Sequence, residues 1–372
     1  MLHYQGMPVA RHIRALIETR FSGARVERIS PFGIDVEDDA GATEKGIGYG
    51  APLRIRFRDA EDRVRDVVLH TATADEFGHD RRADRCAEML LGYDTFGAIP
   101  NHVAALDIGA IRSDDALVSL RDCGELFLLT EYAPGEVYAE DLRRLARGSA
   151  VTDRDRARVD QLADYLAALH ERRVDVSPSV YTRAIRDLVG AGEGIYGIVD
   201  GYPAGAPAAP PERLASIERA CAMWRWKTRG GEGRLRRIHG DFHPFNILFD
   251  DGDRLSLLDA ARGCTGDPAD DVVCLAINFP FFALEAPATW PELRALYDRF
   301  WSRYFEHRSD HGLLEIAPPY LAWRALVIAN PVWYPNLAPS ARDVLLSIAE
   351  RALAEGAFRI DLVDEIMRER AR

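Results

Sequence analysis

Lysine is almost absent from this sequence of 372 residues, in which Lys45 and Lys227 are the only two. Positive charge therefore comes almost entirely from arginine. Acidic residues outnumber basic ones by 59 to 47, which gives a formal net charge of −12. A chain with this balance offers no basic field to a nucleic-acid backbone, so nucleic acid is not expected as a partner.

Cysteine is also scarce and follows no pattern. The chain has five cysteines, an odd number, and none of them has the CxxC or Cys/His spacing of a metal site. Apolar runs are short as well, because none reaches the roughly 18 residues of a membrane span. The N-terminus has no secretory signal. We therefore expect a cytoplasmic protein that does not bind a membrane.

Two kinds of pattern divide the chain. Residues 24–129 contain short β-rich runs separated by Gly and Asp turns, with one helical segment at 80–96. Helical spacing dominates after that point. The sequence predicts an α+β fold with a small β-rich lobe at 1–132 and a larger, mainly α-helical lobe at 133–372.

Several elements can be placed within these lobes. Residues 54–57 and 65–71 flank a polar turn and predict a β-hairpin. Residues 126–131 form an apolar run that ends before a Pro-Gly pair and predict a further strand. Residues 190–211 are rich in Gly, Pro and Ala and predict a long surface loop or a substrate-side insertion.

One segment in the second half of the chain contains the chemistry. Asp241 and Asn246 stand in an H-G-D-x-x-x-x-N run, with the Asp-to-Asn spacing of the catalytic loop of protein kinases. An Asp-Gly turn between the apolar runs 247–249 and 255–258 predicts a hairpin that brings Asn246 beside Asp259. Mg²⁺ suits such a sparse oxygen-ligand pair. Each residue alone is explained as a turn cap or strand end, but together they predict a phosphotransfer site.

This segment resembles the aminoglycoside phosphotransferase and choline kinase superfamily. His239–Asn246 matches its HGDxHxxN loop, Gly266–Asp271 matches its G-D-P-x-x-D stretch, and Leu162–His170 matches its L-A-x-x-L-x-x-L-H helix. The resemblance extends over most of residues 40–280. It implies a protein-kinase-like, two-lobed fold, with a nucleotide-binding lobe at 1–132 and a catalytic and substrate-binding lobe at 133–372. It also implies a small-molecule phosphotransferase.

The resemblance also implies roles for individual residues. Asp241 is then the catalytic base or the residue that orients the acceptor hydroxyl, while Asn246 and Asp259 hold Mg²⁺. His239 is then a structural brace of the loop.

The same resemblance identifies residues 126–133 as the hinge that binds the nucleotide base. The backbone groups of Glu131 and Ala133 would then bond to the base. Taken as a plain sequence, this segment is a buried strand followed by a turn.

Three glycines belong to the nucleotide side of the pattern. Gly46, Gly48 and Gly50 precede a strand, as a phosphate-covering loop does, because glycine lets backbone amides approach phosphate closely. A flexible turn explains them equally well.

The phosphate-binding lysine of related kinases is missing. Period-two alternation places His70 at the position of this lysine. Lys45 or a neighbouring arginine is the alternative source of positive charge. Glu88 is the candidate for the helix glutamate that holds the lysine in related kinases, with Asp84 as the alternative.

Candidates on the acceptor side are His243, Arg262, Trp333 and Tyr334. Arg262 follows Asp259 by three residues and is a candidate for contact with a phosphate or an anionic substrate. A salt bridge from Arg262 to Asp267 or Asp271 is the structural alternative.

The predicted function is transfer of the γ-phosphoryl group of ATP or GTP to a hydroxyl group of a small molecule, with Mg²⁺ as cofactor. Two alternatives remain open. The missing lysine fits a nucleotide-binding pseudokinase with a regulatory role. A nucleotidyl (AMP) transferase would use the same residues with the triphosphate reversed.

Overall fold

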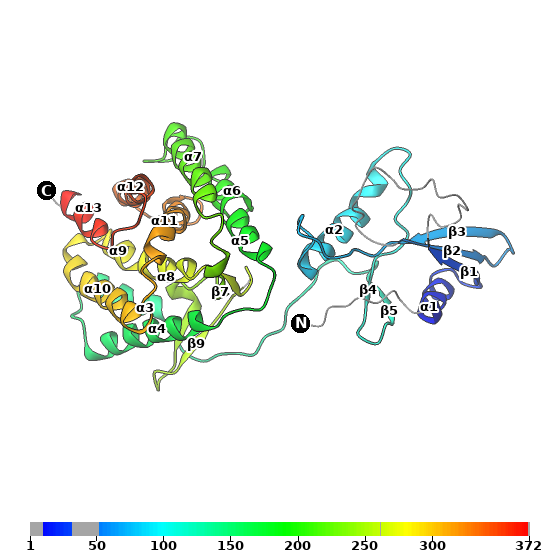
Figure 1. Cartoon of the computed structure of the whole chain (residues 1–372), viewed down its shortest axis with the longest axis horizontal. Coiled ribbons are helices and arrows are strands. Elements are labelled where there is room, and N and C mark those ends of the chain that lie inside the picture. The colour runs from blue at the N-terminus through cyan, green and yellow to red at the C-terminus, as the bar shows by residue number, and fades with distance from the viewer. Residues whose placement is uncertain (1–9, 32–51, 261, 371–372) are drawn as a thin grey trace. The chain divides into compact units, whose positions relative to one another are not determined.

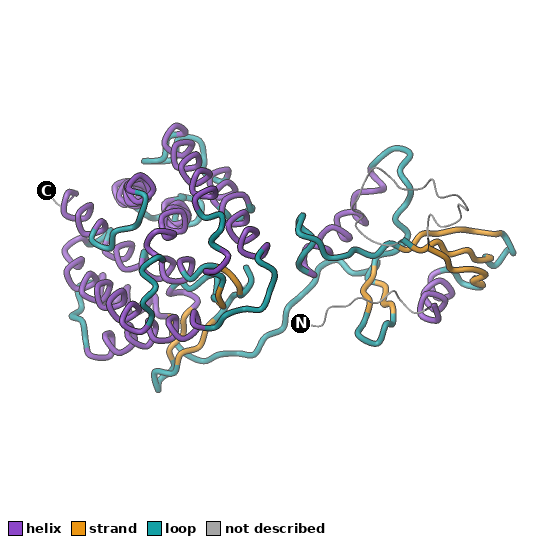
Figure 2. The backbone as a smooth tube through the Cα atoms, viewed as in Figure 1, coloured by secondary structure: helices purple, strands orange, loops and turns teal. Residues whose placement is uncertain are grey.

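The computed structural model describes residues 10–31, 52–260 and 262–370. The chain divides into two compact units, Met1–Thr130 and Glu131–Arg372, and the division falls just before the boundary predicted at residues 132 and 133. The described part of the N-terminal unit contains strands, two α-helices and long loops, whereas helices dominate the C-terminal unit (Figures 1 and 2). The predicted α+β class is confirmed.

The N-terminal unit contains two α-helices, one short 3-10 helix (Phe96–Ala98) and five strands among its described residues. The α-helices and strands are α1 (Ala10–Arg20), β1 (Arg25–Pro31), β2 (Leu53–Arg58), β3 (Val64–Leu69), α2 (Arg82–Thr95), β4 (Gly109–Ile111) and β5 (Leu117–Ser119). Strands β1, β2 and β3 form an antiparallel sheet in that order. Leu53, Ile55 and Phe57 alternate along β2 and therefore face one side of this sheet. They share a buried cluster with Ile13 and Ile17 of α1.

The predicted hairpin between residues 54 and 71 is confirmed. Leu53 at the start of β2 lies opposite Leu69 at the end of β3. Asp59 closes the turn, because its Oδ1 accepts hydrogen bonds from the backbone N–H groups of Glu61 (3.1 Å) and Arg63 (3.0 Å).

Two predicted elements are wrong. Residues 126–131 form no strand, and Phe127, Leu128 and Leu129 are 92%, 88% and 87% exposed. A strand needs neighbouring backbone groups to pair with, and no strand of the described chain supplies them here. The surface loop predicted at 190–211 instead contains the helix α6 (Ile195–Asp200), because two isoleucines at helical spacing are buried there.

The C-terminal unit is built mainly from helices. Its helices are α3 (Tyr138–Ala146), α4 (Asp153–Glu171), α5 (Ser179–Gly190), α6, α7 (Pro211–Lys227), α8 (Ala269–Ala276), α9 (Asn278–Ala283), α10 (Trp290–His307), α11 (Leu313–Ala329), α12 (Pro339–Glu355) and α13 (Leu362–Arg370). Helix α11 is buried along most of its length and packs against α8 and α12. Among the described residues, no helix is long and apolar enough to cross a membrane.

Short strands position the central loops of this unit. They are β6 (Glu136–Val137), β7 (Arg236–Arg237), β8 (Ile247–Phe249), β9 (Leu255–Leu257) and β10 (Thr265–Gly266). The sheet order is β6-β8-β9, and β7 pairs with β10. The loop between β7 and β8 therefore begins beside the segment that precedes β10.

Candidate active site

A buried carboxylate anchors the loop that contains Asp241. Asp271, near the start of α8, accepts hydrogen bonds from the backbone N–H groups of His239 (2.7 Å) and Gly240 (2.8 Å). His170 Nε2 lies 3.2 Å from the same carboxylate. Burial opposes the charge of Asp271, but the hydrogen bonds from His170 and the two backbone groups hold its pKa below the ordinary value.

The loop also runs close to the segment before β10. Gly240 has a φ of 83°, and a Cβ atom at this position would lie 2.8 Å from the carbonyl oxygen of Gly263. The backbone N–H of Ile238 donates to the carbonyl oxygen of Cys264 at 3.2 Å. Glycine at position 240 therefore permits both the left-handed turn and the close approach of two backbones.

His239 braces the loop from within. The backbone N–H of Asp241 donates to His239 Nδ1 at 3.2 Å. The His239 ring packs edge-on against Phe242, which stacks on Tyr165 with ring centroids 5.9 Å apart. These contacts fit the structural role suggested for His239 by the resemblance.

Asp241 lies between two guanidinium groups. Arg262 Nη2 contacts Oδ1 of Asp241, and Arg324 Nη1 donates to the same oxygen at 2.8 Å. Burial opposes the charge of Asp241, but the positive charges of Arg324 and Arg262 hold its pKa below the ordinary value. Asp241 is therefore ionised at neutral pH, the form that accepts a hydrogen bond from a hydroxyl group.

Asn246 and His243 lie on the other side of the Asp241 carboxylate. Asn246 Nδ2 donates to the carbonyl oxygen of Asp241 (3.1 Å) and to its Oδ2 (3.3 Å). His243 Nε2 lies 3.6 Å from Oδ2. Burial lowers the pKa of His243 and outweighs the opposite effect of Asp241, so this imidazole is neutral.

The hairpin predicted after Asn246 is confirmed. Strands β8 and β9 are antiparallel, with Ile247 opposite Leu257. The backbone N–H of Leu258 donates to the carbonyl oxygen of Asn246 at 2.9 Å. Asp259, an exposed residue, therefore follows directly after the residue that pairs with Asn246.

Arg262 contacts the loop rather than either predicted salt-bridge partner. Its Nε and Nη2 donate to the carbonyl oxygen of Gly240 at 3.0 and 2.6 Å, and its guanidinium lies 4.6 Å from the ring centroid of Trp323. The salt bridge suggested with Asp267 or Asp271 is wrong. Asp267 is instead paired with another arginine, Arg234, at 2.7 Å.

Sequence reasoning missed Arg324 and Asp270. Arg324 lies on α11, where it is the only charged residue after the first turn of an otherwise apolar helix. Such an isolated charge in an apolar helix was a usable signal, because a buried charge must have a partner. Asp270 is that partner, since its Oδ1 accepts from Arg324 Nη2 at 2.8 Å.

Trp333 and Tyr334 lie in the turns that follow α11. Trp333 is 60% exposed. Tyr334 packs edge-on against Phe281 with ring centroids 5.3 Å apart, and burial raises the pKa of its hydroxyl. Neither aromatic residue is among the described residues that hydrogen-bond to Asp241. Their predicted contact with substrate therefore stays a prediction.

The nucleotide-side candidates are divided between the N-terminal unit and the first residues of the C-terminal unit. Gly46, Gly48 and Gly50 lie outside the described residues, as does Lys45. Glu131 is exposed and Ala133 is half-buried, in a segment without regular structure. The strand expected to form the hinge is therefore missing from the described structure, and base binding by these two residues stays a prediction.

His70 and Glu88 have different surroundings from those expected. His70 is exposed and follows β3 directly, so the strand predicted to contain it ends one residue earlier. Glu88, on α2, lies 3.4 Å from Nε2 of His79. The alternative acid Asp84 caps α2, because its carboxylate accepts from the backbone N–H of Arg81 at 2.9 Å.

The period-two alternation along β3 assigns His70 to one face of the β1-β2-β3 sheet, and two arginines of β2 lie on that face. Arg54 is paired with Val68 across β2 and β3, and Arg56 is paired with Asp66. Hydrogen bonds from Arg56 and Arg54 lower the pKa of Asp66 to about 2. Arg54 is thus a specific candidate for the neighbouring arginine considered in place of the missing lysine.

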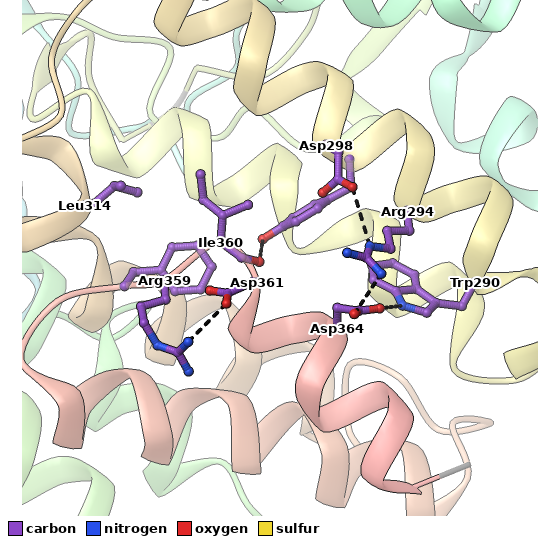
Figure 3. Close-up of a pocket in the computed structure, with 10 residues that line it drawn as sticks. Trp290, Arg294, Asp298, Leu314, Arg359, Ile360, Asp361 and Asp364 are labelled. Carbon is purple, nitrogen blue, oxygen red and sulfur yellow. Dashed lines mark hydrogen bonds and ion pairs between the residues drawn. The ribbon is translucent and has the colours of Figure 1, made fainter.

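A pocket of about 410 Å³ lies elsewhere in the C-terminal unit (Figure 3). Its lining comes from α10, α13, the segment before α13 and the start of α11. Arg294 in this pocket pairs with Asp364 at 2.7 Å and with Asp298 at 3.4 Å. These charges satisfy one another, and none of the lining residues belongs to the Asp241 loop. We therefore assign the chemistry to the loop and not to this pocket.

Comparison with known proteins gives one family match. A sequence profile of the APH family, the phosphotransferase enzyme family, matches residues 95–313, which is more than half of the chain. The resemblance inferred from the loop motifs is confirmed by this match. No curated protein sequence matches the chain significantly.

Three solved structures with similarity to the chain are distant in sequence. An ethanolamine kinase from Plasmodium vivax is 12% identical, with 87% of this chain and 80% of that chain covered and a TM-score of 0.33. Choline kinase LicA from Streptococcus pneumoniae is 15% identical over 93% and 98% of the two chains, with a TM-score of 0.32. Aminoglycoside phosphotransferase APH(3'')-Id from Streptomyces rimosus is 18% identical over 84% and 99%, with a TM-score of 0.32.

Proposed function

We propose, from the premise that the chain belongs to the phosphotransferase enzyme family, that it transfers the γ-phosphoryl group of ATP or GTP to a hydroxyl group of a small molecule. The observation that carries this proposal is the geometry of one loop. Asp241 is held ionised there by Arg324 and Arg262, and the amide of Asn246 is bonded to it.

Asp241 acts on the acceptor in the proposed reaction. The acceptor oxygen forms a bond to the γ-phosphorus, the bond from this phosphorus to the β–γ bridging oxygen breaks, and the nucleoside diphosphate leaves. The hydroxyl proton passes to the carboxylate of Asp241. The transition state of phosphoryl transfer requires little covalent catalysis by the protein. Catalysis therefore rests on positioning and on electrostatic stabilisation.

Asn246 and Asp259 have the donor set that Mg²⁺ prefers. Asn246 turns its Nδ2 toward Asp241, which leaves its Oδ1 as a hard oxygen donor. The β8–β9 pairing brings Asp259 next to the residue bonded to Asn246. Two protein oxygens suit a cation that takes its other ligands from phosphate and water. Mg²⁺ bound there would neutralise phosphate charge.

On the nucleotide side we propose Gly46, Gly48 and Gly50 as the phosphate-covering loop, with the backbone of Glu131 and Ala133 binding the base. His70 and Arg54 are the proposed replacements for the missing lysine. Arg54 lies opposite Val68 across β2 and β3, and His70 directly follows β3. A guanidinium carries a permanent positive charge. We retain Glu88 as a candidate, although its observed partner is His79.

We also propose a cytoplasmic location. All five cysteines are free thiols, and Cys86, Cys123 and Cys264 are exposed. Exposed free thiols are typical of a reducing compartment.

Thermal unfolding tests the nucleotide and metal sites together. Wild type, Asp259→Ala and the control Asp251→Ala, which changes an exposed acid in the same hairpin, are compared with ATP or GTP, with and without Mg²⁺. Nucleotide at 100 times Kd should add about 2.7 kcal/mol of stability. We expect this gain in wild type and Asp251→Ala only with Mg²⁺, and its loss in Asp259→Ala.

Product analysis then separates the reaction types. Release of ADP or GDP supports phosphoryl transfer, whereas pyrophosphate identifies the nucleotidyl transferase alternative. Nucleotide binding without any product identifies the pseudokinase alternative. A wild type that is stabilised by neither nucleotide at millimolar concentration refutes the proposed function.

A further inference from the structure

Arg324 is a buried charge whose hydrogen bonds all go to the Asp241 loop and to one further acid. Its side chain is only 8% exposed. Nη1 donates to Oδ1 of Asp241 at 2.8 Å, and Nη2 donates to Oδ1 of Asp270 at 2.8 Å. Its guanidinium also packs on the ring of Trp323, 3.9 Å from the centroid. A guanidinium held at three points has little freedom to rotate.

Asp270 fixes the other end of this arrangement. It precedes Asp271, the residue that anchors the backbone of the loop, on the first turn of α8. Two successive acidic residues of α8 thus hold the same loop through different contacts. Asp271 holds the backbone N–H groups of His239 and Gly240, whereas Asp270 acts through Arg324 on the side chain of Asp241.

The two arginines bind the same oxygen of Asp241. Oδ1 accepts from both Arg324 and Arg262, which uses both of its lone pairs. Oδ2 has weaker neighbours, with Asn246 Nδ2 at 3.3 Å and His243 Nε2 at 3.6 Å. Of the two carboxylate oxygens, Oδ2 is therefore the one that can accept a further hydrogen bond.

We infer that Arg324, held by Asp270, is a positioning residue for Asp241 and presents Oδ2 to the acceptor hydroxyl. This inference rests on the proposed function, because it takes Asp241 as the residue that receives the acceptor. Arg262 alone gives a weaker restraint, since its side chain is 29% exposed, whereas that of Arg324 is 8% exposed. Arg324 adds a second hydrogen bond to the same carboxylate, from a buried side chain on α11.

MgATP hydrolysis tests the inference, with water in place of the acceptor hydroxyl. Arg324→Met and Arg324→Lys are compared with wild type for kcat, for KM of MgATP and for thermal stabilisation by MgATP. Arg213→Met is the control, because Arg213 is another partly buried arginine of the C-terminal unit that bonds Asp343 and Glu350 and not the loop. Each variant is assayed below its own Tm.

We expect Arg324→Met to lower kcat by about 100-fold, the effect of misplacing a reacting group by about 1 Å, with KM and MgATP stabilisation close to wild type. Arg324→Lys should recover part of the rate, because an ammonium can bond Asp241 but cannot bridge two carboxylates in the planar geometry of a guanidinium. The Arg213→Met control should lower Tm and leave kcat unchanged.

Wild-type kcat in folded Arg324→Met would overturn the inference while leaving the proposed function intact. If Arg324→Met does not fold, Arg324→Lys and Asp270→Asn decide the matter in the same way, since unchanged kcat in both overturns the positioning role. Absence of both stabilisation and turnover in wild type, with MgATP and also with MgGTP, refutes the proposed function, and the inference falls with it.

Discussion

Removal of the Asp271 carboxylate should loosen the loop and destabilise the C-terminal unit. In Asp271→Ala the N–H groups of His239 and Gly240 lose their acceptor, and so does Nε2 of His170. A buried donor left without a partner costs about 1–3 kcal/mol. The two backbone groups alone therefore predict a loss of about 4 kcal/mol in the free energy of unfolding. For a unit of this size, that loss lowers Tm by roughly 8–16 °C.

Circular dichroism during heating measures this change. Asp164→Ala is the matched control, because Asp164 pairs with Arg303 at 2.7 Å on the surface, with side chains 41% and 33% exposed. An exposed pair contributes at most about 1 kcal/mol, so Tm should fall by only a few degrees. A Tm for Asp271→Ala within 2 °C of wild type would refute the view that Asp271 anchors the loop, given the roughly 2–4 °C expected per kcal/mol.

Two further changes test local features. Gly240→Ala should reduce turnover and lower Tm, because its Cβ would lie 2.8 Å from the carbonyl oxygen of Gly263 at a φ of 83°; wild-type kinetics and Tm would contradict this reasoning. Burial opposes the charge of Asp155, but hydrogen bonds from Thr152 hold its pKa below the ordinary value. The stability that ionised Asp155 contributes is complete above the unfolded pKa of about 3.9, and it is lost as pH falls through the lower pKa of the folded state. The free energy of unfolding in urea should therefore fall less between pH 6 and pH 3 in Asp155→Asn than in wild type. Equal losses in the two proteins would argue against a stabilising charge on Asp155.

Local patterns in the sequence predicted the elements whose partners lie nearby in the chain. The hairpin between Asn246 and Asp259 follows from an Asp-Gly turn between two apolar runs, and the structure has strands β8 and β9 there. The hairpin of β2 and β3 was equally predictable. In both, turn chemistry and alternation determine register without help from distant residues.

Apolar character alone did not predict strands reliably. Residues 126–129 have the composition of a buried strand, yet Phe127 is 92% exposed. Composition reports what a segment would gain by burial, whereas a strand also requires a neighbour that pairs with its backbone. The isoleucines of α6 illustrate the converse, since helical spacing inside a Gly- and Pro-rich stretch was enough to bury Ile195 and Ile198.

The electrostatic setting of Asp241 depends on contacts that no local pattern encodes. Arg324 lies 83 residues from Asp241 and 54 residues from Asp270, so the packing of α11 against α8 brings them together. A motif can identify the carboxylate that meets the acceptor, but the charge and orientation of that carboxylate depend on which distant side chains pack around it. An arginine in an apolar helix indicates that a buried hydrogen-bond acceptor, such as an acid, must lie near it, because a guanidinium cannot lose its charge in a protein. Which acid it meets follows only from the fold.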